Sequence, residues 1–354
     1  MTFSIITPSF KQLDWLRLCV ASIRDQVWNG TGDEGRESGA ESREPRVESR
    51  EPRGRAKSFD ARLPPTLCVE HIIQDAGSPG IEDFAHEIGA DFYRDGALVF
   101  ASEGFRSQES EFRENNPRPS TLDPRPYRIS IYCESDSGMY DAVNRGFRRA
   151  TGEVFAYLNC DEQYLPGTLA RVAGLFDENP QTEVLFCDAI VVDAEGGYLC
   201  DRRVMVPSRL HTLVSGNLSV FTSSTFCRDQ VFSKRGLFFD PSFKNVGDAE
   251  WALRLITNSV SMEAVRLRAS AFTDTGDNLN MQPSGLLEKE RLRGTAPRWA
   301  KICAPLIVAL YRLRRLLAGI YNLTPHTYEI FTRESPETRI PIEVEKPSFH
   351  WPGR

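Results

Sequence analysis

Residues 127–162, YRISIYCESDSGMYDAVNRGFRRATGEVFAYLNCDE, decide the fold of this chain. An alternating apolar run ends in acidic residues and leads into a helical pattern, and a second apolar run ends in the pair Asp161-Glu162. Both runs are typical of buried strands, whose carboxyl ends form the ligand-binding edge of an open α/β sheet. Carboxylates at this edge suit a hard cation such as Mg2+ or Mn2+, which in turn suits a diphosphate.

Alternating strand and helix patterns continue on both sides of this stretch. A strand and a helix are expected between Phe3 and Gln26, and further strands end at Asp75, at Glu134 and at Asn159. A hairpin with its turn at 195–197 follows. This alternation predicts a Rossmann-like, doubly wound α/β fold with a mainly parallel sheet and helices on both faces.

The composition limits the classes of function. A chain of 354 residues has room for one large α/β domain with appendages or for two ordinary domains. Its net charge of −6 offers no chain-wide attraction to nucleic acid. The eight cysteines are scattered singly, which favours buried thiols in a reducing compartment over disulfides or zinc. The N-terminus has the pattern of a strand and not of a signal peptide, so we expect a cytoplasmic protein.

Two polar segments interrupt the pattern. Residues 29–65 contain two copies of ESREPR and little that could be buried, which predicts a disordered insertion. The Pro-rich residues 102–126 resemble a second, polar insertion on the surface. We therefore expect one domain over residues 1–270 and a C-terminal extension over residues 271–354.

The extension contains a basic amphipathic helix, expected over residues 305–320. Its apolar stripe and its off-stripe arginines are Leu306, Leu310, Leu313, Leu317 and Ile320, and Arg312, Arg314 and Arg315. Two interpretations are open. The stripe packs on the domain and leaves the arginines in solvent, or the helix lies on the inner face of a membrane as a peripheral contact.

The segments DSGMYDAVNRG, residues 136–146, and LNCDE, residues 158–162, resemble motifs of the family 2 glycosyltransferases of GT-A fold. IIQDAGS at 72–78 and VGDAEWALRL at 246–255 resemble two further motifs of this family. The resemblance implies an inverting, metal-dependent enzyme of polysaccharide or glycoconjugate biosynthesis. Its donor would be a nucleoside diphosphate-sugar, above all a UDP-sugar, and its acceptor a hydroxyl group of a glycan or lipid-linked glycan.

The resemblance also implies roles for individual residues. Asp248 is the expected catalytic base, Asp161 the expected ligand of Mg2+ or Mn2+, and Glu162 its assistant. Glu250 and Trp251 are candidates for the acceptor pocket, although packing in the core is the favoured alternative for Trp251. The residues implied in donor binding are Thr7, Pro8, Phe10, Asp75 at the uracil, Asp136, Gly138, Asp141, Asn144 and Asn159.

The chain departs from the family pattern at several positions. Ser137 stands where a basic residue is common, Asn159 where the first Asp of a D-x-D motif often stands, and Thr222 where His is common. These departures keep a non-catalytic nucleotide- or carbohydrate-binding subunit open as an alternative. A sugar nucleotidyltransferase of the same fold is a second alternative, and Asp248 has an alternative role as a helix N-cap.

Overall fold

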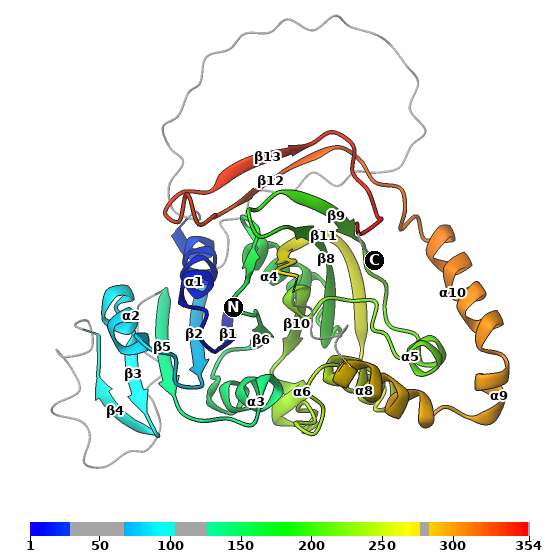
Figure 1. Cartoon of the computed structure of the whole chain (residues 1–354), viewed down its shortest axis with the longest axis horizontal. Coiled ribbons are helices and arrows are strands. Elements are labelled where there is room, and N and C mark those ends of the chain that lie inside the picture. The colour runs from blue at the N-terminus through cyan, green and yellow to red at the C-terminus, as the bar shows by residue number, and fades with distance from the viewer. Residues whose placement is uncertain (29–66, 103–125, 277–282, 353–354) are drawn as a thin grey trace, which may run out of the picture.

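The computed structural model describes residues 1–28, 67–102, 126–276 and 283–352. The two expected insertions therefore lie outside the described residues, except for Ser102 and Pro126. One large mixed sheet runs through the molecule (Figure 1). Its strands are β1 (Thr2–Ser9), β2 (Cys68–Asp75), β3 (Asp91–Arg94), β4 (Ala97–Phe100), β5 (Tyr127–Cys133), β6 (Val154–Tyr157), β7 (Glu162–Tyr164), β8 (Val184–Val192), β9 (Tyr198–Arg202), β10 (Thr225–Arg228) and β11 (Met262–Thr273).

The strand order is β4-β3-β5-β2-β1-β6-β10-β8-β11-β7, with β9 paired to β8 as the predicted hairpin. Strands β3, β5, β2, β1 and β6 are parallel neighbours, whereas β10, β4 and β7 pair in the antiparallel sense. Ser9 at the end of β1 is in register with Asp75 at the end of β2, so the carboxyl ends lie at one edge of the sheet. The predicted mainly parallel α/β sheet is confirmed.

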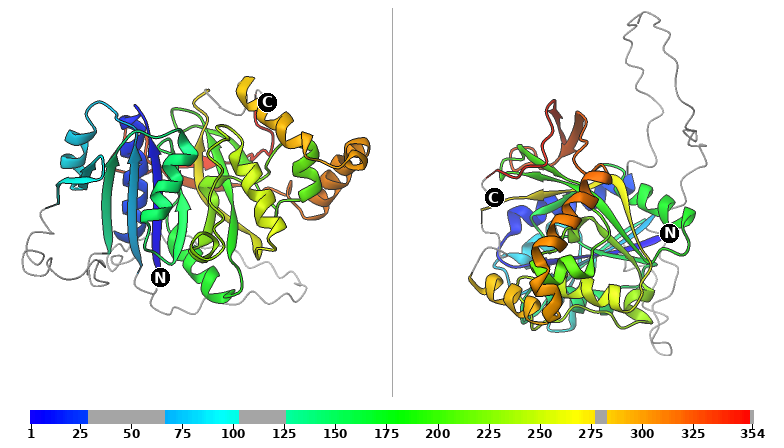
Figure 2. Two further views of the ribbon diagram at one scale, coloured as in Figure 1. Left: turned by 90° about the horizontal axis from the view of Figure 1, so that it is seen from below. Right: turned by 90° about the vertical axis from the view of Figure 1, so that its right-hand side faces the viewer.

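Helices cover both faces of the sheet, as the two views in Figure 2 show. In β1, Phe3 and Ile5 share a core with Cys19 of α1 (Leu13–Trp28) and with α4 (Thr168–Glu178). Ile6 points to the other face, where it packs with Val143 of α3 (Met139–Arg149). Because neighbouring strand residues point to opposite faces, one apolar strand serves two helix layers.

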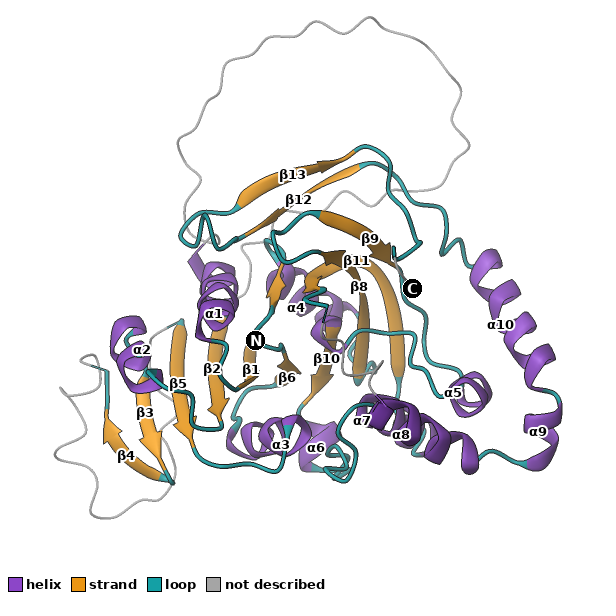
Figure 3. Cartoon of the chain, in the orientation of Figure 1, coloured by secondary structure: helices purple, strands orange, loops and turns teal. Residues whose placement is uncertain are grey.

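Three further helices of the domain follow β9 in the chain. They are α5 (Arg209–Ser215), the short α6 (Gln230–Ser233) and α7 (Gly247–Thr257), and α2 (Ile81–Ile88) lies near the opposite edge of the sheet (Figure 3). Three helices of the C-terminal region follow: α8 (Pro283–Gly294), α9 (Arg298–Ile302) and α10 (Ala304–Leu317).

The C-terminal region also contains a hairpin that the sequence did not predict. Strands β12 (His326–Ile330) and β13 (Ile340–Val344) pair with each other and lie across one end of the sheet (Figure 1). Tyr328 and Ile330 share a core with Ile190 of β8, and Gln163 of β7 exchanges two hydrogen bonds with the backbone of Phe331. The expected boundary between residues 270 and 271 falls inside β11, so the extension continues the main sheet.

Helix α10 forms close to its predicted position, but it docks by an unexpected face. Gly319, at φ 64°, ends the helix, because the Gly319 and Ile320 amides bond back to Leu316 and Arg315. Ile320 is buried, whereas the four leucines of the predicted stripe are 49–79% exposed. The interpretation that the stripe packs on the domain is therefore wrong. No helix among the described residues is long and apolar enough to cross a membrane.

Candidate active site

The candidate site lies where the strand order reverses. From β1 the chain moves through α1 to β2 on one side, and β6, on the other side of β1, is reached through α3. Ligands of open α/β sheets bind outside the carboxyl ends of the strands at this point. Ser9 and Phe10 lie there at the end of β1, and the turn 159–162 follows β6. Phe10 is 54% exposed, and the buried hydroxyl of Ser9 has no hydrogen-bond partner in the described chain.

Thr7, predicted to border the base, points into the core. Its hydroxyl lies 2.9 Å from Nε2 of His71, whose Nδ1 lies 3.0 Å from the Tyr127 hydroxyl. Burial, with the nearby charge of Arg24, lowers the pKa of His71 to about 3, so this network is uncharged. Thr7 is thus a structural residue. Pro8 at the end of β1 and Phe10 just after it remain the candidates for contact with the nucleobase.

Asp75 shapes a loop. Its Oδ1 accepts hydrogen bonds from the Gly77 and Ser78 amides at 2.9 and 2.6 Å, and its Oδ2 accepts one from the Ser78 hydroxyl at 2.7 Å. The Ser78 hydroxyl in turn accepts from the amide of Lys11, which joins the loops after β1 and β2. Asp75 is fully buried. The structure therefore gives Asp75 a role in this loop, and its contact with the uracil stays a prediction.

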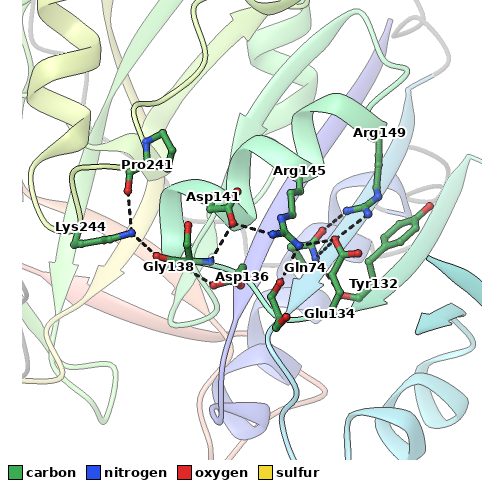
Figure 4. Close-up of polar contacts among 12 residues, drawn as sticks. Gln74, Tyr132, Glu134, Asp136, Gly138, Asp141, Arg145, Arg149, Pro241 and Lys244 are labelled. Carbon is green, nitrogen blue, oxygen red and sulfur yellow. Dashed lines mark hydrogen bonds and ion pairs between the residues drawn. The ribbon is translucent and has the colours of Figure 1, made fainter. Parts of the chain in front are cut away.

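The acidic residues at the start of α3 are also paired (Figure 4). Asp136 accepts a hydrogen bond from the Gly138 amide at 2.8 Å, and Gly138 has a φ of 122°, which favours glycine. Asp141 accepts from the Ser137 amide and from Arg145, both at 3.0 Å. Burial opposes the effect, but these hydrogen bonds lower the pKa of Asp141. Both carboxylates thus hold the turn that leads into α3.

Lys244 brings a cation to the same turn, as Figure 4 shows. Its Nζ donates hydrogen bonds to the carbonyl oxygens of Ser137 and Pro241, the latter at 2.8 Å, and its stem lies against Gly138. The positive charge therefore stands beside Ser137, where the family pattern has a basic residue. Lys244 lies 107 residues further along the chain, so no local motif could reveal it.

Asn144, predicted to bind the donor, holds a protein loop instead. Its side chain donates to the Phe239 carbonyl at 2.8 Å and accepts from the Phe239 amide at 2.9 Å, and it is buried. Gly146, two residues later, lies so close to β1 that a Cβ atom would sit 2.4 Å from Ile6. These two motif residues join α3 to the sheet and to the segment that leads to α7.

Asp248 lies in the first turn of α7, beside Tyr140. Its amide donates to the Tyr140 hydroxyl at 3.1 Å, and a Cβ atom on Gly247 would lie 2.7 Å from the Tyr140 ring. The family pattern usually has an acidic residue before the Asp at this position. In this chain Tyr140 leaves no room for a side chain, which explains Gly247. The N-cap residue is Val246, so the N-cap interpretation of Asp248 is wrong. Burial raises the pKa of Asp248 to about 6, although hydrogen bonds from amides and Tyr140 oppose the rise.

Glu288 of α8 fixes the segment before α7. Its carboxylate accepts hydrogen bonds from the amides of Lys244, Asn245 and Val246 at 2.7, 2.9 and 3.0 Å. These amides precede a helix and attract an anion. A residue of the C-terminal region thus positions both Lys244 and the start of α7. Sequence reasoning missed Glu288, because nothing local distinguishes it from a surface glutamate.

The turn between β6 and β7 carries acidic residues that no cation balances. Glu162 accepts a hydrogen bond from the Asn159 amide at 2.8 Å, and its own amide bonds to the Asn159 carbonyl. Burial raises the pKa of Asp161, and burial together with the charge of Asp161 raises the pKa of Glu162. Neither carboxylate forms an ion pair with any residue in the described ranges. Asn159 therefore supports Glu162 in this turn.

A divalent cation fits the β6–β7 turn. Two adjacent carboxylates without a counter-charge repel each other, and a bound cation removes that cost. The part of the chain that the structure describes contains no group of three or more potential metal ligands. Asp161 and Glu162 are therefore the residues that could hold the ion, with its other positions left to phosphate oxygens and water, as Mg2+ often requires.

Tyr157 connects this turn with Asp248. After burial itself, the charges of Asp248 and Glu162 both raise the pKa of Tyr157, so both carboxylates lie near this ring. The Tyr157 hydroxyl is hydrogen-bonded to Thr222, the residue that replaces the common His. The carboxylates of Glu162, which follows β6, and of Asp248, which lies in α7, thus approach one another at the edge of the sheet.

The two residues expected in an acceptor pocket lie in different environments. Trp251 is 3% exposed, donates its indole N–H to the Leu237 carbonyl and packs on Phe239, so it is a core residue. Glu250 pairs with Arg254 and lines a pocket of about 360 Å3 between α5, α7 and α8. Glu250 and Asp248 are two residues apart and lie on different sides of α7. The acceptor-pocket prediction is wrong for Trp251, and Glu250 does not face Asp248.

Residues 124–228 match the family described as Glycosyl transferase family 2. The match contains both the α3 motif and the β6–β7 turn. Residues 124–228 of this chain therefore resemble a family 2 glycosyltransferase domain. Over 196 residues it is 24% identical to a PGL/p-HBAD biosynthesis glycosyltransferase of Mycobacterium bovis, with 52% of this chain and 68% of that protein covered. A protein of the same description from Mycobacterium tuberculosis gives the same values.

Solved structures of S. aureus TarS 1–349 are similar at lower identity. The complex with UDP-GlcNAc has a TM-score of 0.49 and 13% identity, with 83% of this chain and 65% of that chain covered. The complex with UDP has a TM-score of 0.47 and 13% identity, with 83% and 64% covered. This chain therefore spans less than two thirds of each of these TarS chains.

Proposed function

We propose that this chain is a glycosyltransferase that transfers a sugar, with inversion, from a nucleoside diphosphate-sugar to a hydroxyl group of a glycan or lipid-linked glycan. UDP is the nucleotide that the family resemblance implies. The observation that carries the proposal is the approach of Asp248 and the Asp161-Glu162 turn to Tyr157 from two elements. None of the three carboxylates has an ion-pair partner among the residues that the structure describes.

Asp161, assisted by Glu162, would hold Mg2+ or Mn2+ together with the donor diphosphate. A bound cation supplies Lewis-acid stabilisation of the departing diphosphate. Lys244 adds a second positive charge at the α3 start, where Ser137 offers none. The buried Ser9 hydroxyl and the exposed Phe10 ring are available for the nucleotide at the switch point.

Asp248 would act as the general base. Its raised pKa of about 6 lies near the pH at which a base works best, because the group is then ionised and still basic. The proton of the acceptor hydroxyl moves to the Asp248 carboxylate while the acceptor oxygen bonds to the anomeric carbon. The bond from that carbon to the diphosphate breaks in the same displacement. One displacement inverts the configuration and needs no covalent intermediate on the enzyme.

The departures from the family pattern are compatible with activity. Lys244 stands beside Ser137, Asn159 supports Glu162, and Thr222 is bonded to Tyr157. The family match of residues 124–228 favours transfer over the two alternatives, a binding subunit and a nucleotidyltransferase. The cysteines in the described ranges are all free thiols, which supports our proposal of a cytoplasmic location.

Hydrolysis of UDP-sugars by the purified enzyme tests this function without a known acceptor. We expect slow hydrolysis that needs Mn2+ or Mg2+ and stops in EDTA. Proton NMR of the first-formed sugar should show the anomer opposite to that of the donor. A first-formed sugar of retained configuration, or hydrolysis that persists unchanged in EDTA, would overturn the proposed mechanism.

A further inference from the structure

Helix α10 is attached to the rest of the protein by one face only. Its contacts are chiefly with α5. Tyr311, which is 5% exposed, stacks on His211 at 3.7 Å between ring centroids, and its hydroxyl bonds to Ser219 at 2.6 Å. Further along this face, Arg315 lies over the rings of Tyr321 and Phe349. This side of α10 is therefore fully used in packing.

The opposite face of α9 and α10 presents large apolar side chains to solvent. The leucines of α10 are spaced by four, three and four residues, which places them on one side of the helix. A helix in a water-soluble protein normally turns such a stripe inward. We call the following residues the leucine face: Trp299, Ile302, Leu306, Leu310, Leu313 and Leu317, each about half exposed or more.

The charge around the leucine face has a single sign. Between Glu290 and Glu329 the sequence has seven basic residues and no acidic residue, although the chain as a whole has a net charge of −6. At 3.6 residues per turn, Arg312 and Arg314 lie on opposite sides of the leucine stripe, and both are exposed. The two helices also lie at the outer margin of the molecule in Figures 1 and 2.

We propose that the leucine face docks on the surface of an anionic lipid bilayer. An apolar stripe bordered by arginines matches the boundary between acyl chains and anionic headgroups, and Trp299 is a residue type enriched at that boundary. A second copy of the chain fits less well, because two leucine faces in contact would bring their arginines together. The helices would lie in the interface without crossing the bilayer.

Docking would place the active site close to the lipid surface. Helix α10 packs on α5, which contacts both α7 and α8. Helix α7 carries Asp248, and α8 carries Glu288, which holds the segment before α7. A lipid-linked acceptor could then reach Asp248 from the membrane; this consequence rests on the proposed function, whereas the docking itself does not.

Co-sedimentation with vesicles tests the proposal on the full chain. We expect binding to vesicles of phosphatidylcholine with phosphatidylserine, and weaker binding in high salt or without phosphatidylserine. The variants Leu310→Glu/Leu313→Glu and Arg312→Glu/Arg314→Glu should each lower the apparent affinity by about tenfold or more. Leu98→Glu/Val99→Glu, which changes two exposed apolar residues of β4 at the far edge of the sheet, should bind as the parent does.

The same variants separate docking from folding and from dimerisation. Their melting temperatures and UDP affinities should equal those of the parent, because the changed side chains are exposed. Absence of vesicle binding in low salt would overturn the proposal, as would parental binding by Leu310→Glu/Leu313→Glu. A parental dimer in sedimentation velocity that becomes a monomer in that variant would also overturn it, because a second copy would then cover the face.

Discussion

The start of α3 and the β6–β7 turn both carry acidic residues that the family motifs single out, but the environments of these residues are opposite. In the α3 start, residues 134–145, hydrogen bonds from arginines and amides outweigh burial and lower the pKa values of Glu134 and Asp141. In the β6–β7 turn, residues 159–162, burial without a cation raises the pKa values of Asp161 and Glu162. The paired carboxylates hold the fold, and the unbalanced ones are available for chemistry.

Asp248 belongs with the unbalanced group. Its pKa is raised to about 6, and it forms no ion pair with a described residue. Burial of an unbalanced carboxylate costs stability, since the charged form loses its hydration. Such strain is typical of functional sites. The comparison therefore predicts that substitutions in the two groups have different signatures, one in stability and the other in binding or rate.

Asp248→Asn should have the largest effect. Amide replacement removes the base, so transfer or donor hydrolysis should fall by about a hundredfold or more. UDP affinity should stay near the parent value, and the melting temperature should not fall, because Val246 and not Asp248 caps α7 and the buried charge is removed. Steady-state kinetics, calorimetric titration with UDP and a melting curve on one preparation give all three values. Full activity of this variant would show that Asp248 has a structural role and is not the base.

Gly247→Ala should break the contact between α3 and α7. A Cβ atom would lie 2.7 Å from the Tyr140 ring, so Tyr140 and the first turn of α7 must shift. We expect a loss of about 1–3 kcal/mol in the free energy of unfolding, the usual cost of overpacking, together with a loss of activity. Urea denaturation measures the first and donor hydrolysis the second.

Gly174→Ala is the matched control for Gly247→Ala. Gly174 lies in α4, and a Cβ atom there would meet no atom within 4 Å. The substitution should stabilise the protein by about 0.5–1 kcal/mol, because alanine loses less conformational entropy in a helix. Equal free energies of unfolding for the two variants would contradict the close contact between Gly247 and Tyr140.

The sequence predicted the sheet, its parallel core, the β8–β9 hairpin and the position of the β6–β7 turn. These features depend on local patterns: apolar runs, helical spacing and short motifs. The contents of the site were harder to predict. Lys244 and Glu288 are far in the sequence from the residues that they contact at the site, and no local motif marks either of them.

The motif residues also divide in a way that their spacing does not reveal. Asp75 and Asn144 have the residue types of ligand-binding groups. Both side chains are buried, however, and both are hydrogen-bonded to the backbone of nearby loops. Whether a carboxylate or amide is already satisfied depends on the backbone around it. For the same reason the leucine stripe of α10 could be predicted from the sequence, whereas the face by which α10 docks could not.

Lys244→Ala tests whether a distant lysine replaces the basic residue missing at position 137. We expect UDP affinity to fall by about tenfold, the effect of one charge-assisted contact. The melting temperature should change little, because Lys244 is exposed. Lys234→Ala, another exposed lysine, should leave UDP affinity unchanged. Equal UDP affinities of the Lys244→Ala variant and the parent would leave the α3 start with a structural role only.

The pH dependence of the rate should show the smallest effect. A base must be deprotonated to act, so kcat at saturating donor and metal should fall to about half near the pKa of Asp248, about 6, and keep falling below it. The residual activity of Asp248→Asn should lack this acidic limb. A limb that survives in the variant would assign the titration to another group.

The central claim is that the carboxylates of the unbalanced turn, and not the carboxylates of the α3 start, bind the metal on which donor binding depends. Calorimetric titration with UDP in Mn2+ and in EDTA, on Asp161→Asn and Asp141→Asn side by side, tests it most directly. We predict that Asp161→Asn loses about tenfold or more of its affinity in Mn2+, with a smaller change in EDTA. Asp141→Asn should stay near the parent in both. Parental affinity of Asp161→Asn in Mn2+, or an equal loss in Asp141→Asn, would contradict the account.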